Sequence, residues 1–274
     1  MDSAFHYEGA DFLAEGVKLA ELAEQCGTPL YVYSRAALTE NYRALERALA
    51  HCAHLICYSV KAASNTAILR LLKDEGSGAD IVSEGELLRC LKAGMDPKKI
   101  VFSGVGKKVS EMKAALEAGI LMFNVESAGE MELLNRAAGE KGVRAPMAFR
   151  VNPDVDPQTH PYIATGLRES KFGVPVSEAP ELYKTAAGLA NLEVIGADCH
   201  IGSQLTKVSP FEAAAERMEN LLGELAGLGI ALKYLDMGGG LGIRYRDEEV
   251  PRAEDYGAAV SKIAGRFRDL TLII

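Results

Sequence analysis

The stretch Tyr234–Ile243, "YLDMGGGLGI", joins a short apolar run to three consecutive glycines, and it decides between two arrangements of the rest of the chain. Glycine loses much conformational freedom on folding, so three in a row imply a tight turn or a close approach to the backbone. The spacing is G-x-G-x-G, whereas a dinucleotide-binding turn has G-x-G-x-x-G. The glycines therefore suit a phosphate-binding loop after a strand and argue against a doubly wound dinucleotide fold.

Apolar or β-branched runs alternate with longer segments of helical period along most of the chain. Eight runs are predicted to be strands: Leu55–Ser59, Ala79–Val82, Ile100–Ser103, Leu121–Asn124, Met147–Val151, Glu193–His200, Tyr234–Met237 and Leu270–Ile274. The segments between them repeat apolar residues at spacings of three and four, and several end at a glycine, as helices do. Eight such units predict an α/β fold, a (β/α)₈ TIM barrel, with the open doubly wound sheet as the alternative.

Two segments before the first predicted strand do not belong to the barrel pattern. "FLAEGVKLAELAEQCG", residues 12–27, is predicted to be helical, and "TPLYVYS", residues 28–34, is predicted to be a strand. At the other end the sequence stops at Ile274, inside the eighth strand, with no helix after it. We therefore divide the chain into an N-terminal segment, 1–35, and a barrel, 36–274. Part of the outer face should be uncovered unless another segment completes the barrel.

Composition excludes several classes of protein. The net charge of −8 argues against a nucleic-acid surface, which needs a basic face. The sequence lacks an apolar run of the roughly 20 residues that a membrane span requires, and its start, "MDSAFHYEGADF", does not resemble a signal peptide. An odd number of cysteines without paired spacing fits reduced thiols: Cys26, Cys52, Cys57, Cys90 and Cys199. We expect a cytoplasmic protein.

Polar residues recur where the predicted strands end, which is where TIM barrels carry their chemistry. Gly238–Gly240 follow the seventh strand, a common place for a phosphate site. Lys61 follows the first strand in "CYSVKAAS". Its neighbours Val60 and Ala62 could desolvate it, so that it loses its proton easily, as a Schiff-base lysine must.

Other polar side chains fall near the same rim. These are Asp80 in the second strand, Arg150 in the fifth, His200 at the end of the sixth, and Ser203 in "DCHIGSQL". A lysine, a histidine, a serine and a phosphate loop on one rim predict pyridoxal 5'-phosphate (PLP) as the cofactor. Its aldehyde would be on Lys61, its ring over His200 and its phosphate at Gly238–Gly240. No metal is expected.

Five motifs resemble those of the diaminopimelate decarboxylases, which are fold-type III PLP-dependent enzymes related to alanine racemase and to ornithine and arginine decarboxylases. They are "YSVKA" (58–62), "GADIVSEGEL" (78–87), "FRVNPDVDPQTHPYIATGLRESKFGV" (149–174), "CHIGSQL" (199–205) and "LDMGGGLGI" (235–243). The resemblance runs in order from about Gly27 to Ile274. The lysine motif is common to the superfamily, whereas "HIGSQ", "HPYIATG" and "KFG" are more specific to this family.

The resemblance implies a role for each candidate residue. Lys61 would form the Schiff base with PLP, and His200 would stack on its ring; both are the catalytic candidates. The remaining cofactor-binding candidates are Asp80 and Arg150, as supporting polar residues, and Ser203, Gly238, Gly239 and Gly240, which would hold the phosphate. The implied reaction is decarboxylation of meso-2,6-diaminopimelate to L-lysine and CO₂, the last step of lysine biosynthesis, by a homodimer.

The sequence departs from the family in two places. Ala63 stands where the family commonly has asparagine after "VKA". The family also continues from strand eight into Glu-Pro-Gly-Arg and a β-domain, to which "TPLYVYS" would contribute. We therefore expect this chain to be the barrel portion of a longer enzyme, and to be inactive alone.

Three alternatives to this function are weighed. The first is a decarboxylase of another basic amino acid, arginine or ornithine. The second is a non-catalytic PLP-binding barrel. The third is a metal-dependent barrel hydrolase that uses His200 and Asp236, although the other histidines do not fall at strand ends. A faint likeness of "SGVGKKVS" to a P-loop is rejected, because Val101 stands where the first glycine should be.

Overall fold

The computed structural model describes residues 4–156, 172–267 and 269–274. Its main sheet is parallel and runs in the order β4-β13-β12-β11-β9-β8-β7-β6-β5. The strands are β4 (His54–Leu55), β5 (Cys57–Ser59), β6 (Gly78–Ile81), β7 (Ile100–Phe102), β8 (Met122–Val125), β9 (Ala145–Asn152), β11 (Leu192–Asp198), β12 (Tyr234–Asp236) and β13 (Thr271–Ile273). A short β10 (Val174–Pro175) pairs with β9. Each of the eight predicted strands coincides with one of these or, in the first case, with β4 and β5 together.

The sheet closes into a barrel because β4 and β5 are two halves of one strand, separated only by Ile56. β4 pairs with β13, and β5 pairs with β6. The amide of Cys57 continues the first ladder by donating to the carbonyl of Ile274 at 2.8 Å. The predicted TIM barrel is therefore confirmed.

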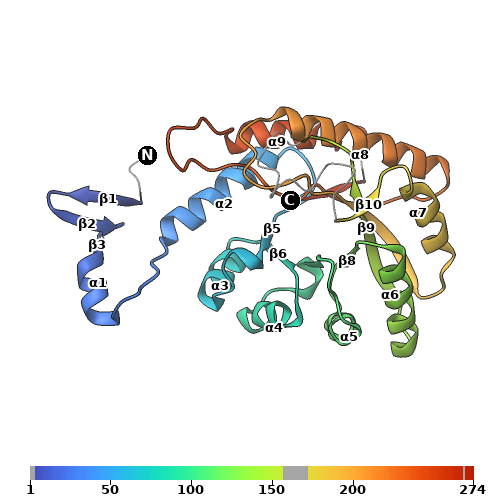
Figure 1. Cartoon of the computed structure of the whole chain (residues 1–274), viewed down its shortest axis with the longest axis horizontal. Helices are drawn as coiled ribbons and strands as arrows, with labels where there is room; N and C mark the ends of the chain where they lie inside the picture. Colours follow the sequence, from blue (N-terminus) through green and yellow to red (C-terminus); the bar gives the residue numbers. More distant parts are fainter. Residues whose placement is uncertain (1–3, 157–171, 268) are drawn as a thin grey trace.

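Helices cover the outside of the barrel (Figure 1). Those that follow strands are α3 (Thr66–Asp74), α4 (Glu84–Ala93), α5 (Val109–Ala118), α6 (Ala128–Lys141), α7 (Ala179–Gly188), α8 (Ser209–Gly227) and α9 (Ala253–Ser261), with short 3₁₀ turns η1 (Val60–Ala62) and η2 (Pro97–Lys99). Their ends follow local rules. The hydroxyl of Ser83 accepts the amide of Glu86 at the start of α4, and Gly94 ends that helix with φ of 85°.

Helix α2 (Arg35–Leu49), which precedes the first strand, occupies the place of an eighth helix. It packs against α9 on one side and α3 on the other. The contact with α9 is close, because a Cβ added at Gly257 would lie 2.9 Å from both the Cβ and the carbonyl oxygen of Ala48. Of the two alternatives, an uncovered outer face or another segment that completes the barrel, the structure shows the second. A barrel is circular, so a helix before strand one can cover the gap that follows strand eight.

The N-terminal segment differs from its prediction. It forms a small antiparallel sheet of β1 (Phe5–Glu8), β2 (Asp11–Ala14) and β3 (Val17–Lys18), followed by α1 (Leu19–Cys26). The helix expected over 12–27 therefore begins only at Leu19. Residues 28–34 are not a strand, because they pair with no strand among the described residues. Figure 1 shows this sheet standing away from the barrel.

Alternate residues of each barrel strand face opposite sides. One large apolar cluster fills the space between strands and helices. A smaller cluster forms an apolar layer on the other face of the strands, inside the barrel: Cys57, Val101, Met122, Ala148, Ile195 and Ile273. Between Val194 and Gly196 the pairing of β11 with β9 shifts register. The hydroxyl of Tyr183 bridges the two strands at this bulge. It donates to the carbonyl of Gly196 at 2.9 Å and accepts from the amide of Phe149 at 3.2 Å.

The α2–α9 contact can be tested with two alanine substitutions. Gly257→Ala should lower the free energy of unfolding by about 1–3 kcal/mol, because the new methyl group overpacks the contact with Ala48. Gly223→Ala, on an exposed position of α8 where an added Cβ meets nothing within 4 Å, should instead stabilise the protein by about 0.5–1 kcal/mol. Urea unfolding of both variants measures the difference. An equal gain in both would show that α2 does not pack tightly on α9.

Candidate functional site

The eight predicted site residues line one cavity of about 320 Å³. They are Lys61, Asp80, Arg150, His200, Ser203, Gly238, Gly239 and Gly240. The cavity lies at the carboxyl ends of the strands, where Gly238 follows β12 and His200 follows β11. The structure therefore brings together every residue of the predicted set. The "HPYIATG" motif lies outside the described residues.

Lys61 stands in the turn η1 directly after β5. Its Nζ lies 3.7 Å from Oδ2 of Asp80, and its side chain is 61% exposed. The expectation that Val60 and Ala62 would desolvate this lysine is wrong, because the Lys61 side chain stays largely exposed and Ala62 is itself exposed. Oδ2 of Asp80 also accepts from the hydroxyl of Ser59 at 3.1 Å, whereas Oδ1 is buried without a hydrogen-bond partner. The cavity thus holds a reachable amine beside an acceptor that a ligand could satisfy.

His200 is held as a neutral ring. Burial lowers its pKa to about 3, and the positive charges of Arg150 and Lys61 act in the same direction. A neutral imidazole offers a flat, weakly polar face. It is therefore suited to lie against an aromatic ligand without carrying a positive charge into the site.

A buried ion pair supports the side of the cavity formed by β8 and β9. The guanidinium of Arg150 lies 3.1 Å from Oε1 of Glu126, and both side chains are largely buried. Oε2 of Glu126 accepts the amide of Gly173 at 2.9 Å. Arg150 is thereby fixed in orientation, since one partner of a buried pair is costly to leave alone.

The three glycines after β12 have different structural roles. A Cβ added at Gly238, where φ is 63°, would lie 2.8 Å from the carbonyl of Cys199 and from Nδ1 of His200. A Cβ at Gly240, where φ is 111°, would lie 2.0 Å from the carbonyl of Gly202. These two glycines let the loop pack on the turn after β11. A Cβ at Gly239 would meet nothing within 4 Å, although Gly239 lines the cavity, so only this glycine leaves its space to a ligand.

Sequence reasoning missed a ring of polar residues above the apolar layer inside the barrel. The ring contains four residues that come two or three positions after a member of that layer in the sequence: Ser59, Ser103, Asn124 and Asp198. Asp198 and Asp236 are register partners on β11 and β12. The signal that would have found them is the period of two: residues two apart on a strand share a face, so Asp198 lies on the side of His200.

The buried carboxyl groups of this ring hold their protons tightly. Burial raises the pKa of Asp236 to about 7, and the charge of Asp80 adds to the effect. Burial and the neighbouring Asp236 raise the pKa of Asp198 well above its usual range. Oδ2 of Asp236 accepts from Nδ2 of Asn124 at 3.1 Å, and Oδ1 accepts the amide of Gly238 at 2.9 Å.

The lysine of the rejected P-loop likeness has a structural role. Nζ of Lys107 is buried and donates to the carbonyls of Gly104 at 2.8 Å and Asn124 at 2.7 Å, and to Glu130 at 2.7 Å. It therefore ties two strand ends together instead of facing the cavity.

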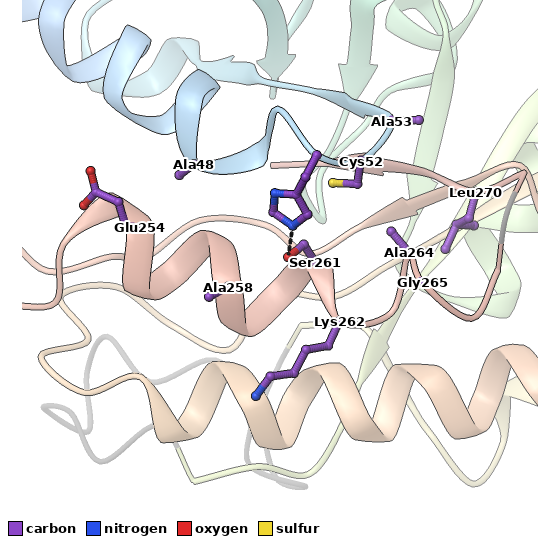
Figure 2. Close-up of a pocket in the computed structure, with 11 residues that line it drawn as sticks. Ala48, Cys52, Ala53, Glu254, Ala258, Ser261, Lys262, Ala264, Gly265 and Leu270 are labelled. Carbon is purple, nitrogen blue, oxygen red and sulfur yellow. Dashed lines mark hydrogen bonds between the residues drawn. The ribbon is translucent and has the colours of Figure 1, made fainter.

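A larger cavity, of about 710 Å³, lies between α2 and α9 (Figure 2). None of the predicted site residues lines it. Ala48, Ala258 and Ala264 are typical of its lining, and its hydrogen bond joins Nε2 of His51 to the hydroxyl of Ser261 at 2.8 Å. Ala53 and Leu270 place it beside the amino ends of β4 and β13, the end of a TIM barrel that serves stability.

Within the described part of the chain, no three His, Cys, Asp or Glu side chains group as metal ligands would. Among the described helices, none is long and apolar enough to span a bilayer.

Comparisons with known proteins agree on one family. The profile described as "Pyridoxal-dependent decarboxylase, pyridoxal binding domain" matches residues 35–274. The diaminopimelate decarboxylase of Pseudomonas aeruginosa is 56% identical over 98% of the chain, and that of Vibrio cholerae is 52% identical over all of it. The chain spans 65% and 66% of their lengths.

Solved structures give the same result. Diaminopimelate decarboxylase from Helicobacter pylori complexed with L-lysine is 41% identical, with a TM-score of 0.89 over 93% of this chain and 64% of that one. The enzyme from M. jannaschii, in co-complex with L-lysine, is 38% identical with a TM-score of 0.90 over 98% and 65% of the two chains. Lysine decarboxylase from Selenomonas ruminantium is less similar, 26% identical with a TM-score of 0.81 over 96% and 67%.

The glycine loop gives a test that separates folding from binding. Gly239→Ala should leave the thermal stability unchanged but weaken PLP binding by about 1–2 kcal/mol, the order of an overpacked contact. Gly240→Ala should lower stability as well, because its Cβ meets the carbonyl of Gly202. Gly129→Ala, on α6, is the control with open space and no contact with the cavity. Unchanged PLP affinity in Gly239→Ala would mean that the loop is only a turn.

The neutral state of His200 gives a pH test. Its pKa is about 3 in the folded protein and about 6.5 when unfolded, so the unfolded chain binds more protons between these values. The free energy of unfolding should therefore fall as the pH drops from 6.5 towards 3. At pH 4.5, His200→Gln should avoid about 2–3 kcal/mol of this loss. Urea unfolding of the cofactor-free protein at pH 7 and pH 4.5 makes the comparison, and equal acid sensitivity would contradict a buried neutral ring.

Proposed function

Because the chain belongs to the pyridoxal-dependent decarboxylases, and is their pyridoxal-binding domain, we propose that it forms the catalytic barrel of a diaminopimelate decarboxylase. The reaction is loss of the carboxylate at the D-configured centre of meso-2,6-diaminopimelate, which yields L-lysine and CO₂. The observation that carries the proposal is the single cavity that gathers Lys61, His200 and the glycine loop. The relatives from Pseudomonas aeruginosa, Vibrio cholerae and Haemophilus influenzae, which are 56%, 52% and 50% identical over the aligned residues, are named for this activity.

The residues of the cavity fit PLP. Lys61 offers a reachable amine, His200 a neutral face, and Gly239 open space beside backbone amides. The unpartnered Oδ1 of Asp80 is an acceptor that a bound group can satisfy. When bound, PLP supplies the electron-withdrawing ring that takes up the electron pair left by the departing carboxylate.

Each residue then has a defined task. Lys61 holds the cofactor through Nζ and can carry a proton to or from the reacting carbon, with Asp80 orienting the amine. His200 packs against the ring face. Ser203 binds the phosphate through its hydroxyl and Gly239 through its amide. Gly238 and Gly240 let the loop pack on the turn after β11 and so hold it in place. Arg150, which is held by its ion pair with Glu126, places a positive charge on the β9 side of the cavity.

The N-terminal segment 1–35 is assigned to a second domain in the longer protein. Four of its aromatic side chains are exposed, among them Tyr31 at 86% and Tyr7 at 71%. Its small sheet stands away from the barrel (Figure 1). Large exposed aromatic residues on an outlying element are typical of a surface that another domain covers.

We also propose a cellular setting and partners for the enzyme. Free thiols, among them the exposed Cys26, fit the reducing conditions of a cytoplasm. A homodimer and a small amino-acid substrate follow from the family, and no nucleic acid or membrane is proposed as a partner.

The function is tested with the protein at the full length that its gene encodes. It should release CO₂ from meso-diaminopimelate and form L-lysine, and it should be slower on arginine and ornithine. Lys61→Ala should lower turnover by at least about 10³-fold, the order lost when a covalent catalytic residue is removed. Lys99→Ala, whose amine is bonded to the carbonyl of Gly76 away from the cavity, is the control and should keep its turnover.

Reduction with borohydride locates the cofactor independently of turnover. Peptide mapping should place the pyridoxyl group on Lys61. A label on another lysine would overturn the assignment of Lys61, and faster decarboxylation of arginine or ornithine would overturn the substrate.

A further inference from the structure

A buried tyrosine of α9 forms a hydrogen bond with the loop that follows β12. The hydroxyl of Tyr256 donates to the carbonyl oxygen of Gly238 at 2.9 Å. Tyr256 is only 1% exposed, and its ring packs edge-on against Phe211 of α8, with ring centroids 4.8 Å apart and an interplanar angle of 84°. The hydroxyl is therefore anchored by the packing of two helices and cannot follow the loop if the loop moves.

The same glycine is held at its amide by a second set of bonds. The amide of Gly238 donates to Oδ1 of Asp236 at 2.9 Å, and Oδ2 of Asp236 accepts from the side chain of Asn124 at 3.1 Å. The carbonyl of Asn124 is fixed in turn by Lys107. Both ends of Gly238 are thus tied to buried side chains that no ligand needs to touch.

The bond from Tyr256 sets the direction of the next amide. A peptide unit is planar and trans, so the carbonyl of Gly238 and the N–H of Gly239 point in opposite directions. Because the carbonyl points at the buried Tyr256, the N–H of Gly239 points the other way. Gly239 lines the cavity, and a Cβ there would meet nothing within 4 Å.

We propose that Tyr256 is a positioning residue for phosphate binding, because its hydroxyl holds the Gly238–Gly239 peptide in the orientation that presents the Gly239 N–H to the anion. The inference rests on the proposed function only through the phosphate of PLP. Without the hydroxyl, this glycine peptide can rotate, since no side chain opposes it. Tyr256 itself touches neither substrate nor cofactor.

The chain offers a matched control in Tyr183. Its hydroxyl is also buried and also donates to a glycine carbonyl, that of Gly196, at 2.9 Å. That bond lies at the bulge between β9 and β11. Tyr183 does not line the cavity. Tyr183→Phe removes this bond and the one that the hydroxyl accepts from the amide of Phe149, whereas Tyr256→Phe removes the bond to the glycine loop.

The experiment compares PLP with pyridoxal, which lacks the phosphate. Dissociation constants are measured by absorbance titration of the full-length protein after removal of its cofactor. Tyr256→Phe should weaken PLP binding about 10-fold, the upper range for one neutral hydrogen bond, and leave pyridoxal binding unchanged. Tyr183→Phe should change neither affinity, although it should lose at least as much thermal stability as Tyr256→Phe.

Other outcomes separate the inference from the function it rests on. Equal losses for PLP and pyridoxal in Tyr256→Phe, or no loss, would overturn the role of Tyr256 alone. A wild-type protein that binds neither compound would overturn the proposed function and this inference together. If Tyr256→Phe does not fold, Phe211→Leu keeps the hydroxyl but loosens its anchor, and should weaken PLP binding about 3-fold without affecting pyridoxal. Unchanged PLP binding in that variant would likewise overturn the inference.

Discussion

The closure of the parallel sheet through residues 54–59 is the constraint on which the rest of the structure depends. One half of this segment pairs with β13 and the other with β6, so the first and last strands share a ladder. Closure brings all carboxyl strand ends to one rim. Closure also places the first strand beside the last. Helix α2, which precedes the first strand, can therefore pack beside α9 and cover the position that a helix after the last strand would take. Lys61, His200 and the glycine loop are neighbours only because the ring is complete.

The interior of the barrel has two layers of side chains. The apolar layer contributes to stability, and the polar layer contributes to the candidate site. Apolar residues such as Val101 and Met122 form the lower layer. The next layer holds Asp80, Asp198 and Asp236. Burial raises the pKa of Asp198 and of Asp236, and the charge of Asp80 adds to both effects. Buried carboxyl groups lower stability unless they are paired or protonated. Such an arrangement is typical of a site that keeps polar groups in place for a ligand.

The strand positions could be predicted from the sequence because each strand is a short apolar run between helices, several of which end at a glycine. The rim residues could be predicted because TIM barrels place their chemistry after the strands. Other features depend on packing that no local pattern carries. Residues 28–34 have strand-forming side chains but find no partner strand in the part of the chain that the structure describes. The exposure of Lys61 follows from the turn η1. The roles of Gly238 and Gly240 differ from that of Gly239 only because of the neighbouring turn after β11.

The pairing of the first strand with the last has a consequence for synthesis. His54 pairs with Leu272, 218 residues later in the chain (272 minus 54). At the usual elongation rates of about 5–20 residues per second, roughly 10–45 s separate the two on the ribosome. During that interval β4 is an open edge, with unpaired amides and carbonyls that another chain could pair with. The nascent barrel therefore passes through an aggregation-prone stage whose duration is set by translation speed rather than by the stability of the finished fold.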